Sequence, residues 1–222
     1  MTDWSLLYRP VRRLQERRVT MIVDKKEGRK EAQRKEILTA AEQIFARQGF
    51  HLTTMEEVAT ACAWSKGTLY LHFKSKEDLF FSVIHEKLDM FSATLFPALK
   101  RSQSLEQSLA ILIDAQFQFF IDNLDFFQLA ISEQGKVLHE SSSALRNSLI
   151  EKQQLHIKNT SQVLAKHLPA DCVVKPGTLA RSILGAIDTH TLTWLVSPSS
   201  IDINAIKLEI IHLFLNGVIP NK

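Results

Sequence analysis

Glycine and proline are scarce in this sequence, with seven and six among 222 residues. Because a sheet of many short strands needs turn residues between its strands, this scarcity argues against a mainly β protein. Hydrophobic residues make up 45% of the chain, which is enough for a packed core and too much for a disordered protein. We therefore expect an all-α fold.

Cysteine is nearly absent as well. Cys62 and Cys172 lie far apart, and no Cys-x-x-Cys or Cys/His ligand spacing accompanies them. We therefore expect neither a disulfide framework nor a metal site, and no cofactor. A glycine-rich phosphate loop, a Gly-x-Ser-x-Gly elbow and a His-Glu-x-x-His pair are all missing. Nothing in the sequence indicates an enzyme.

Long apolar runs are missing too. No uninterrupted stretch approaches the roughly 18 residues of a membrane span, and the Arg-rich start has no apolar segment of the signal-peptide kind. We expect a soluble cytoplasmic protein without a membrane partner. The charge is uneven, since residues 1–35 contain eleven Lys or Arg and five Asp or Glu. A basic end suits contact with phosphate, although a solvated charged tail fits the same numbers.

The first residues differ from the rest because they are Arg-rich, contain Pro10 and show no sustained apolar stripe. We assign residues 1–28 to a basic N-terminal tail, for which two interpretations stay open. Either the tail is disordered and adds phosphate or minor-groove contacts, or the segment before Met21 precedes the true translation start. N-terminal sequencing or the intact mass of the native protein would decide between them.

Three helices are expected between residues 29 and 75. The first carries apolar residues at a spacing of 3.6 and ends at Gly49, which suits a left-handed cap. A short second helix begins after Thr53 or Thr54, with a Glu three residues on as in a capping box. Ser65 is the expected N-cap of a third helix that ends near His72 or Phe73, and Ser75 caps the next helix.

The second and third helices form a helix-turn-helix. A small residue is needed where the two helices cross, and Ala59 provides it. Leu69 and Phe73 are the expected inward anchors of the third helix. Its exposed positions are short or polar, as entry into a major groove requires.

The string Ser-Lys-Gly-Thr-Leu-Tyr-Leu-His-Phe-Lys-Ser-Lys-Glu-Asp-Leu at residues 65–79 closely resembles the DNA-binding signature of the TetR family. The resemblance covers about residues 30–85. Where the family commonly has Gly-Val in the turn, this chain has Ala63 and Trp64. Ala63 must then tolerate the positive φ of the turn. Trp64 either packs into the core of the head, which we favour, or projects toward DNA.

The resemblance also implies roles for individual residues. Thr54, Tyr70, Lys74 and Lys76 match phosphate contacts, whereas Lys66, Gly67, Thr68 and His72 match positions that meet base edges. Lys66 is the best candidate for a guanine contact, and Ser65 completes the set. Tyr70 could instead brace the third helix, and His72 could merely close its end. Arg34 and Lys35 either contact phosphate or belong to a solvated face.

Longer helices follow in the body, which we assign to residues 76–222, against residues 29–75 for the DNA-binding domain. One helix stops near Pro97, and others begin at Ser104 and span residues 141–168, 178–196 and 202–217. With the head, the chain is expected to contain about nine helices. The resemblance implies that the last two helices pair with their mates in a homodimer. The residues expected at this interface, which could instead close the subunit's own core, are Ile183, Leu184, Ile187, Trp194, Ile206, Ile210, Leu213 and Phe214.

The resemblance further implies that the body encloses an effector pocket whose filling changes the spacing of the two heads. Thirteen Phe residues favour an apolar ligand, although Phe at helical spacing is also typical of a plain core. The candidate lining residues are Phe91, Phe96, Gln116, Phe117, Phe120, Phe127, His156 and His190. We expect a dimeric repressor of a pseudo-palindromic operator in double-stranded DNA, released by a small apolar effector. The alternative is a DNA-bound regulator whose body binds a protein partner.

Overall fold

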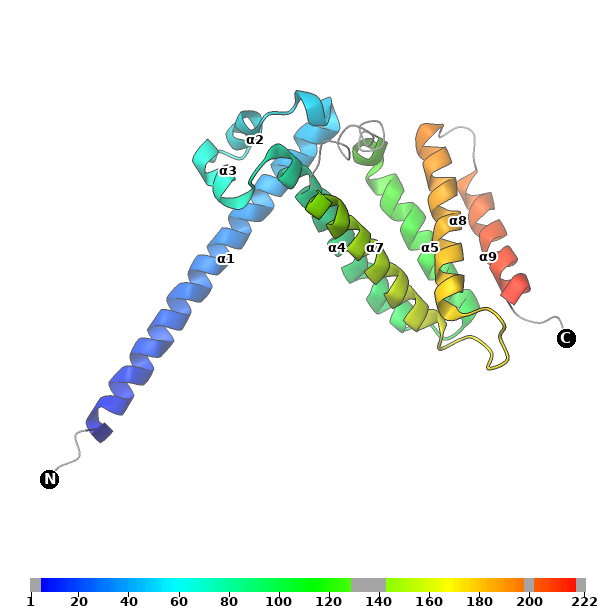
Figure 1. Ribbon diagram of the computed structural model, residues 1–222, viewed down its shortest axis with the longest axis horizontal. Helices are drawn as coiled ribbons and strands as arrows, with labels where there is room; N and C mark the ends of the chain where they lie inside the picture. The colour runs from blue at the N-terminus through cyan, green and yellow to red at the C-terminus, as the bar shows by residue number, and fades with distance from the viewer. Residues whose placement is uncertain (1–4, 129–142, 198–201, 219–222) are drawn as a thin grey trace.

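The computed structural model describes the backbone of residues 5–128, 143–197 and 202–218, and the side chains of residues 27–128, 143–197 and 202–217. Within them the regular structure is entirely helical (Figure 1). The helices are α1 Ser5–Leu52, α2 Met55–Ala61, α3 Lys66–His72, α4 Lys76–Lys100, α5 Leu105–Asp122, α7 Ser143–Leu164, α8 Pro176–Val196 and α9 Ile203–Val218. The predicted all-α fold with a helix-turn-helix head and a larger body is confirmed.

Side-chain caps fix where several helices begin. The Thr54 hydroxyl accepts from the Glu57 amide while the Glu57 carboxylate accepts from the Thr54 amide, so the predicted capping box starts α2. The hydroxyls of Ser65, Ser75 and Ser104 accept in the same way at the starts of α3, α4 and α5. These three caps were all predicted.

Gly49 breaks α1 one turn before its end. Its φ of 89° is positive, as predicted, but its ψ of 168° differs from that of a left-handed helical cap. This extended region of positive φ is open almost only to glycine. The Thr53 hydroxyl donates to the Gly49 carbonyl at 2.6 Å and so ties the loop to the break. Gly49 thereby sets the direction in which the chain enters α2.

Several predicted boundaries were wrong. α1 begins at Ser5 rather than near residue 29. The Arg, Leu and Gln residues between these two positions are good helix formers even without an apolar stripe. α4 continues through Pro97 to Lys100, since Leu95 and Leu99 are both buried and hold the helix on either side of the proline. α7 ends at Leu164 rather than at 168, and residues 141–142 lie outside the described residues. α8 begins at Pro176, a position where proline is well tolerated.

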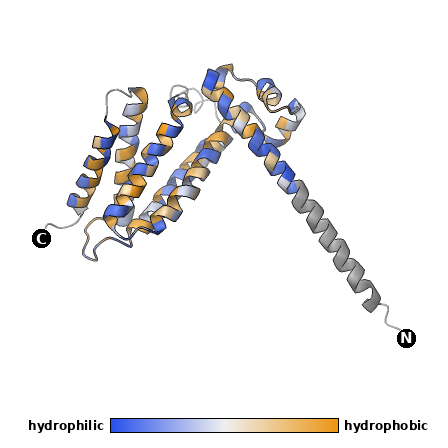
Figure 2. Cartoon of the chain, turned by 180° about the vertical axis from the view of Figure 1, so that it is seen from behind, coloured by the Kyte–Doolittle hydropathy of each residue, from blue (hydrophilic) through white to orange (hydrophobic). Residues whose placement is uncertain are grey.

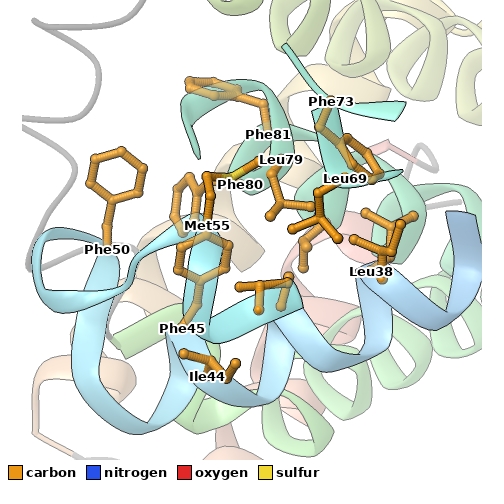
Figure 3. Close-up of a cluster of buried hydrophobic side chains, with 14 of the residues drawn as sticks. Leu38, Ile44, Phe45, Phe50, Met55, Leu69, Phe73, Leu79, Phe80 and Phe81 are labelled. Carbon is orange, nitrogen blue, oxygen red and sulfur yellow. The ribbon is translucent and has the colours of Figure 1, made fainter. Parts of the chain in front are cut away.

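The buried side chains form two cores. The core of the head joins α1, α2, α3 and the first turns of α4, and includes Phe45, Phe50, Leu69, Phe73 and Phe80 (Figure 3). It therefore extends past the predicted boundary between residues 75 and 76. The second core joins the later turns of α4 with α5, α7, α8 and α9. Figure 2 shows apolar and polar residues on different faces of these body helices.

Candidate nucleic-acid interface and effector region

α3 lies at the outer edge of the head, beside α2 and away from the body (Figure 1). Leu69 and Phe73 are buried as predicted, and the Arg34 guanidinium lies 4.8 Å from the centre of the Phe73 ring. Lys66, Gly67, Tyr70 and Leu71 remain exposed. α3 is therefore anchored by one face and presents the other to solvent.

The turn before α3 contains both departures from the family pattern. Ala63 has a φ of 56°, so the predicted positive φ is confirmed, and the Trp64 amide donates to the Ala59 carbonyl at 2.9 Å. The Trp64 ring packs against the core of the head, and its Nε1–H donates to Glu36 Oε2 at 3.0 Å. Core packing of Trp64, the favoured interpretation, is confirmed.

Lys66 is ion-paired with Glu56 of α2, and both side chains are more than half exposed. The hydrogen bond from Lys66 lowers the pKa of Glu56, and the same bond raises the pKa of Lys66. The Lys66 ammonium also lies 6.0 Å from the centre of the Tyr70 ring. Because an exposed ion pair contributes little to stability, Lys66 can exchange Glu56 for another acceptor at low cost.

The residues predicted to contact phosphate differ in the contacts that they make within the protein. Lys76 Nζ donates to the His51 carbonyl at 3.2 Å and lies 4.5 Å from the centre of the Phe50 ring, so it closes the end of α1. Lys74 is exposed, and its amide donates to Asp78 Oδ2 at 2.8 Å. Thr54 is exposed within its capping box. These side chains lie around the starts of α2 and α4.

The other polar residues predicted to contact DNA lie at the two ends of α3. The hydroxyls of Ser65 and Thr68 lie 2.9 Å apart at the start of the helix. His72, near the other end, is half-buried, and its pKa is lowered first by burial and then by the positive charges of Lys30 and Arg34. Cations of α1 thus act on the same end of α3, and such a field favours a phosphate.

An aromatic cluster lies where the head meets the body. The Phe80 ring of the head contacts Phe126 at 5.9 Å between ring centres, and Phe126 contacts Phe127 at 5.6 Å. Phe127 contacts Phe119 at 5.4 Å and Phe120 at 4.8 Å. The cluster therefore runs without interruption from α4 in the head to α5 in the body.

The cluster also reaches α7. Phe91 stacks on Phe119 at 4.6 Å, and the His156 ring lies 5.8 Å from Phe91 and 5.5 Å from Phe96. Five predicted effector residues come together in this way: Phe91, Phe96, Phe120, Phe127 and His156. Phe117 lies apart, fully buried in the body core, and His190 is half-buried on α8.

Buried polar groups lie between α5, α7 and α8. Gln116 Nε2 donates to Asp188 Oδ1 at 3.2 Å, and burial raises the pKa of Asp188. The Oε1 atom of Gln116 and the hydroxyls of Thr160 and Thr191 are buried without a hydrogen-bond partner in the described residues. Sequence reasoning found Gln116 but missed Asp188 and the two threonines, although each is a polar residue in an apolar helix.

A groove of about 760 Å³ opens between α1, α4 and α5. Phe91, Phe119 and Glu42 are among its lining residues, and Phe91 alone of the predicted effector residues borders it. Lys87, also in the lining, is 8% exposed and donates to Glu42 Oε1 at 2.6 Å and to Asn123 Oδ1. Lys87 thus joins α1, α4 and the end of α5, and sequence reasoning missed it.

The predicted dimer residues fall into two groups. Ile183, Leu184, Ile187 and Ile210 are buried in the core of the body, so they serve the subunit's own packing rather than its surface. Trp194, Ile206 and Phe214 are half-buried, and Leu213 is exposed. Leu192, Val196 and Leu208, which the sequence analysis did not name, are exposed apolar side chains on the same two helices.

The described residues contain neither a membrane-spanning helix nor a metal-binding cluster. No helix there is long and apolar enough to cross a membrane. No group of three or more His, Cys, Asp or Glu side chains there could hold a metal ion.

The sequence profile described as bacterial regulatory proteins of the tetR family matches residues 37–83, which span the end of α1, α2, α3 and the start of α4. The head of this chain is therefore a TetR-family DNA-binding domain. The fatty acid metabolism regulator protein of Bacillus subtilis is 27% identical over 187 residues, covering 82% of this chain and 94% of that protein.

Two solved structures of regulators named FadR share the fold. The fatty acid degradation regulator FadR of Bacillus halodurans has a TM-score of 0.68 and 22% identity, covering 83% of this chain and 95% of that one. FadR of Bacillus subtilis in complex with stearoyl-CoA has a TM-score of 0.67 and 22% identity, covering 83% and 98%. The likeness therefore includes the body as well as the DNA-binding head.

Proposed function

We propose that this TetR-family regulator is a homodimeric repressor that leaves a pseudo-palindromic operator when an acyl-type effector occupies its body. The observation that carries the DNA-binding part is the exposed face of α3, held in place by Leu69 and Phe73. One such helix reads too few base pairs to be specific by itself. Two heads about 34–36 Å apart would read two half-sites on one side of the DNA.

Lys66 is the residue whose replacement tests this reading most directly. Lys66→Ala should cost ~1–3 kcal/mol at the operator and relax base preference, because a side chain that contacts a base edge is lost. Glu56→Gln should strengthen operator binding, because it releases Lys66 and removes a negative charge beside DNA. Operators selected from random DNA and measured by fluorescence anisotropy provide the assay.

Lys74→Ala is the matched control for Lys66→Ala. Because a phosphate contact carries no sequence information, this change should weaken binding to operator and random DNA alike and reduce the salt dependence. A Lys66→Ala variant that behaves in this way, with Lys74→Ala altering base preference instead, would reverse the two assignments.

The proposed dimer is supported by the exposed apolar side chains of α8 and α9, two helices that lie side by side at the end of the body away from the head (Figure 1). Leu192 and Val196 lie one turn apart on α8, and Leu208 and Leu213 lie on α9. Burying them against a second copy removes apolar surface from water. Sedimentation that finds only monomers at micromolar concentration would contradict this arrangement.

The acyl-type effector is supported by two independent observations. The first is the aromatic cluster of Phe91, Phe96, Phe119 and His156, which offers an apolar environment between α4, α5 and α7. The second is that a relative is named for fatty acid metabolism and a structural neighbour was solved with stearoyl-CoA. An aromatic cluster at the junction of head and body could change the position of the heads when a ligand separates its rings.

Titration of the operator complex tests the effector. Stearoyl-CoA or stearate should release the DNA, and coenzyme A alone should not. Phe91→Trp should impair release without weakening DNA binding, because the larger ring occupies the space where Phe91 stacks on Phe119. Leu155→Trp on the exposed face of α7 is the control. If no acyl compound releases the DNA or raises the melting temperature, the protein-partner alternative is favoured.

A further inference from the structure

Leu71 is a large apolar side chain that nothing in the described structure covers. It is 79% exposed, although it lies in α3 between half-buried His72 and the partly exposed Tyr70. The buried residue of α3 is Leu69, which points into the head instead. Leu71 therefore adds no packing to the fold, and the exposed face of α3 carries an aliphatic group among polar neighbours.

The side chain of Leu71 leans over a bare stretch of backbone. Side chains in a helix point toward its N-terminus, so Leu71 lies over the turn that contains Gly67, four residues earlier. A Cβ added at Gly67 would meet only the Ser65 hydroxyl, at 3.7 Å. Because no side chain stands at position 67, the backbone of α3 can approach a surface closely and carry Leu71 to it.

An apolar partner for this side chain exists in the major groove of DNA. The C5-methyl of thymine is the apolar group on the base edges there, whereas the other groups are hydrogen-bond donors and acceptors. We propose that Leu71 is a specificity-determining residue that packs on the C5-methyl of one thymine in each half-site. This proposal rests on the proposed binding of α3 in the major groove and names what one further residue reads.

Replacing thymine by deoxyuridine tests the contact because it removes only the methyl group. Each thymine of the selected operator is replaced in turn, in both half-sites, and binding is measured by anisotropy. For the wild-type protein, one position per half-site should weaken binding about threefold to fivefold, as expected for one buried methyl group. Leu71→Ala should bind the unmodified operator more weakly and show no further loss at that position.

Leu52→Ala is the matched control. Leu52 is 72% exposed at the end of α1 and lies outside α3, so its replacement should leave the full deoxyuridine effect in place. Operator selection repeated with Leu71→Ala should also lose the thymine preference at the same position. Equal melting temperatures of the three proteins would show that the fold is unchanged, as expected from the exposure of both leucines.

Two outcomes would overturn the proposal in different ways. If the wild-type protein enriches no operator at all, the proposed DNA-binding function fails and the Leu71 contact fails with it. If an operator is enriched but no single deoxyuridine weakens binding, or if Leu71→Ala remains as sensitive as the wild type, only the Leu71 contact fails.

Discussion

Ala63 occupies a backbone conformation that glycine adopts more easily. Its φ of 56° brings Cβ close to backbone atoms, which costs an alanine roughly 1–2 kcal/mol relative to ordinary regions. We predict that Ala63→Gly stabilises the protein by about 0.5–1 kcal/mol, the strain relief exceeding the added flexibility of the unfolded chain. Urea unfolding measures the difference.

Ala93→Gly provides the comparison for this prediction. Ala93 is exposed in the middle of α4, where glycine should destabilise by about 1 kcal/mol. Loss of stability in both variants would show that the turn holds Ala63 without strain.

Positive φ at Ala63 and packing of Trp64 were both predictable because they follow from the turn itself. The position of Ala63 in a motif fixes its backbone, and a large apolar ring next to a core tends to pack into it. The partner of Trp64 was not predictable in the same way. Glu36 lies 28 residues earlier, and only the crossing of α1 with the turn brings it to the indole.

Several helices begin at a residue whose side-chain hydroxyl accepts a hydrogen bond from the backbone amide three residues later. The Ser104 hydroxyl accepts from the Gln107 amide at 3.1 Å and is exposed, far from the proposed DNA face. We predict that Ser104→Ala destabilises the protein by about 1 kcal/mol while leaving operator binding unchanged. Thermal or urea unfolding and anisotropy measure the two effects.

Ser182→Ala is the control for Ser104→Ala. Ser182 is exposed within α8, where alanine favours the helix and should not destabilise it. An equal loss in both variants would contradict the capping role of Ser104.

The caps were predictable because the sequence contains both partners within one turn. The helix ends were less predictable, as α4 shows at Pro97. A proline removes one backbone hydrogen bond, but burial of Leu95 and Leu99 on both sides favours the continued helix more strongly. Tertiary packing of that kind cannot be read from one segment alone.

The contacts that join the helices into one molecule were the least predictable. Lys87 meets Glu42 across 45 residues and Asn123 across 36, and Gln116 meets Asp188 across 72. The sequence offers many polar residues that could make such pairs, and only the packing of α1, α4, α5 and α8 selects among them. For the same reason, five of the candidate effector residues lie in one cluster, but the sequence did not predict the groove.

Stability should depend on pH through histidines in both the head and the body. Burial is the leading cause that lowers the pKa of His72, His85 and His156. The unfolded chain therefore binds protons more readily as the pH falls through about 6.5, and the folded protein loses stability below that value. Burial raises the pKa of Asp188, so the folded protein binds a proton at this carboxyl more readily than the unfolded chain does. This group therefore adds stability as the pH falls, opposite to the histidines.

His156→Phe tests how much His156 contributes to the pH dependence of stability. A phenylalanine retains the ring contacts with Phe91 and Phe96 but cannot bind a proton. We predict that the variant loses less stability than the wild type between pH 7.5 and pH 5.5, as measured by urea unfolding at each pH. A loss as large as that of the wild type would show that His156 contributes nothing to the dependence.

The tryptophans at positions 64 and 194 also make the protein its own optical probe. Trp64 lies in the turn before α3 with its indole bonded to Glu36, whereas Trp194 is half-buried near the end of α8. Indole emission shifts with the polarity around the ring. With Trp4 replaced, one variant that keeps Trp64 and another that keeps Trp194 would let fluorescence follow the head and the body separately, without an attached dye.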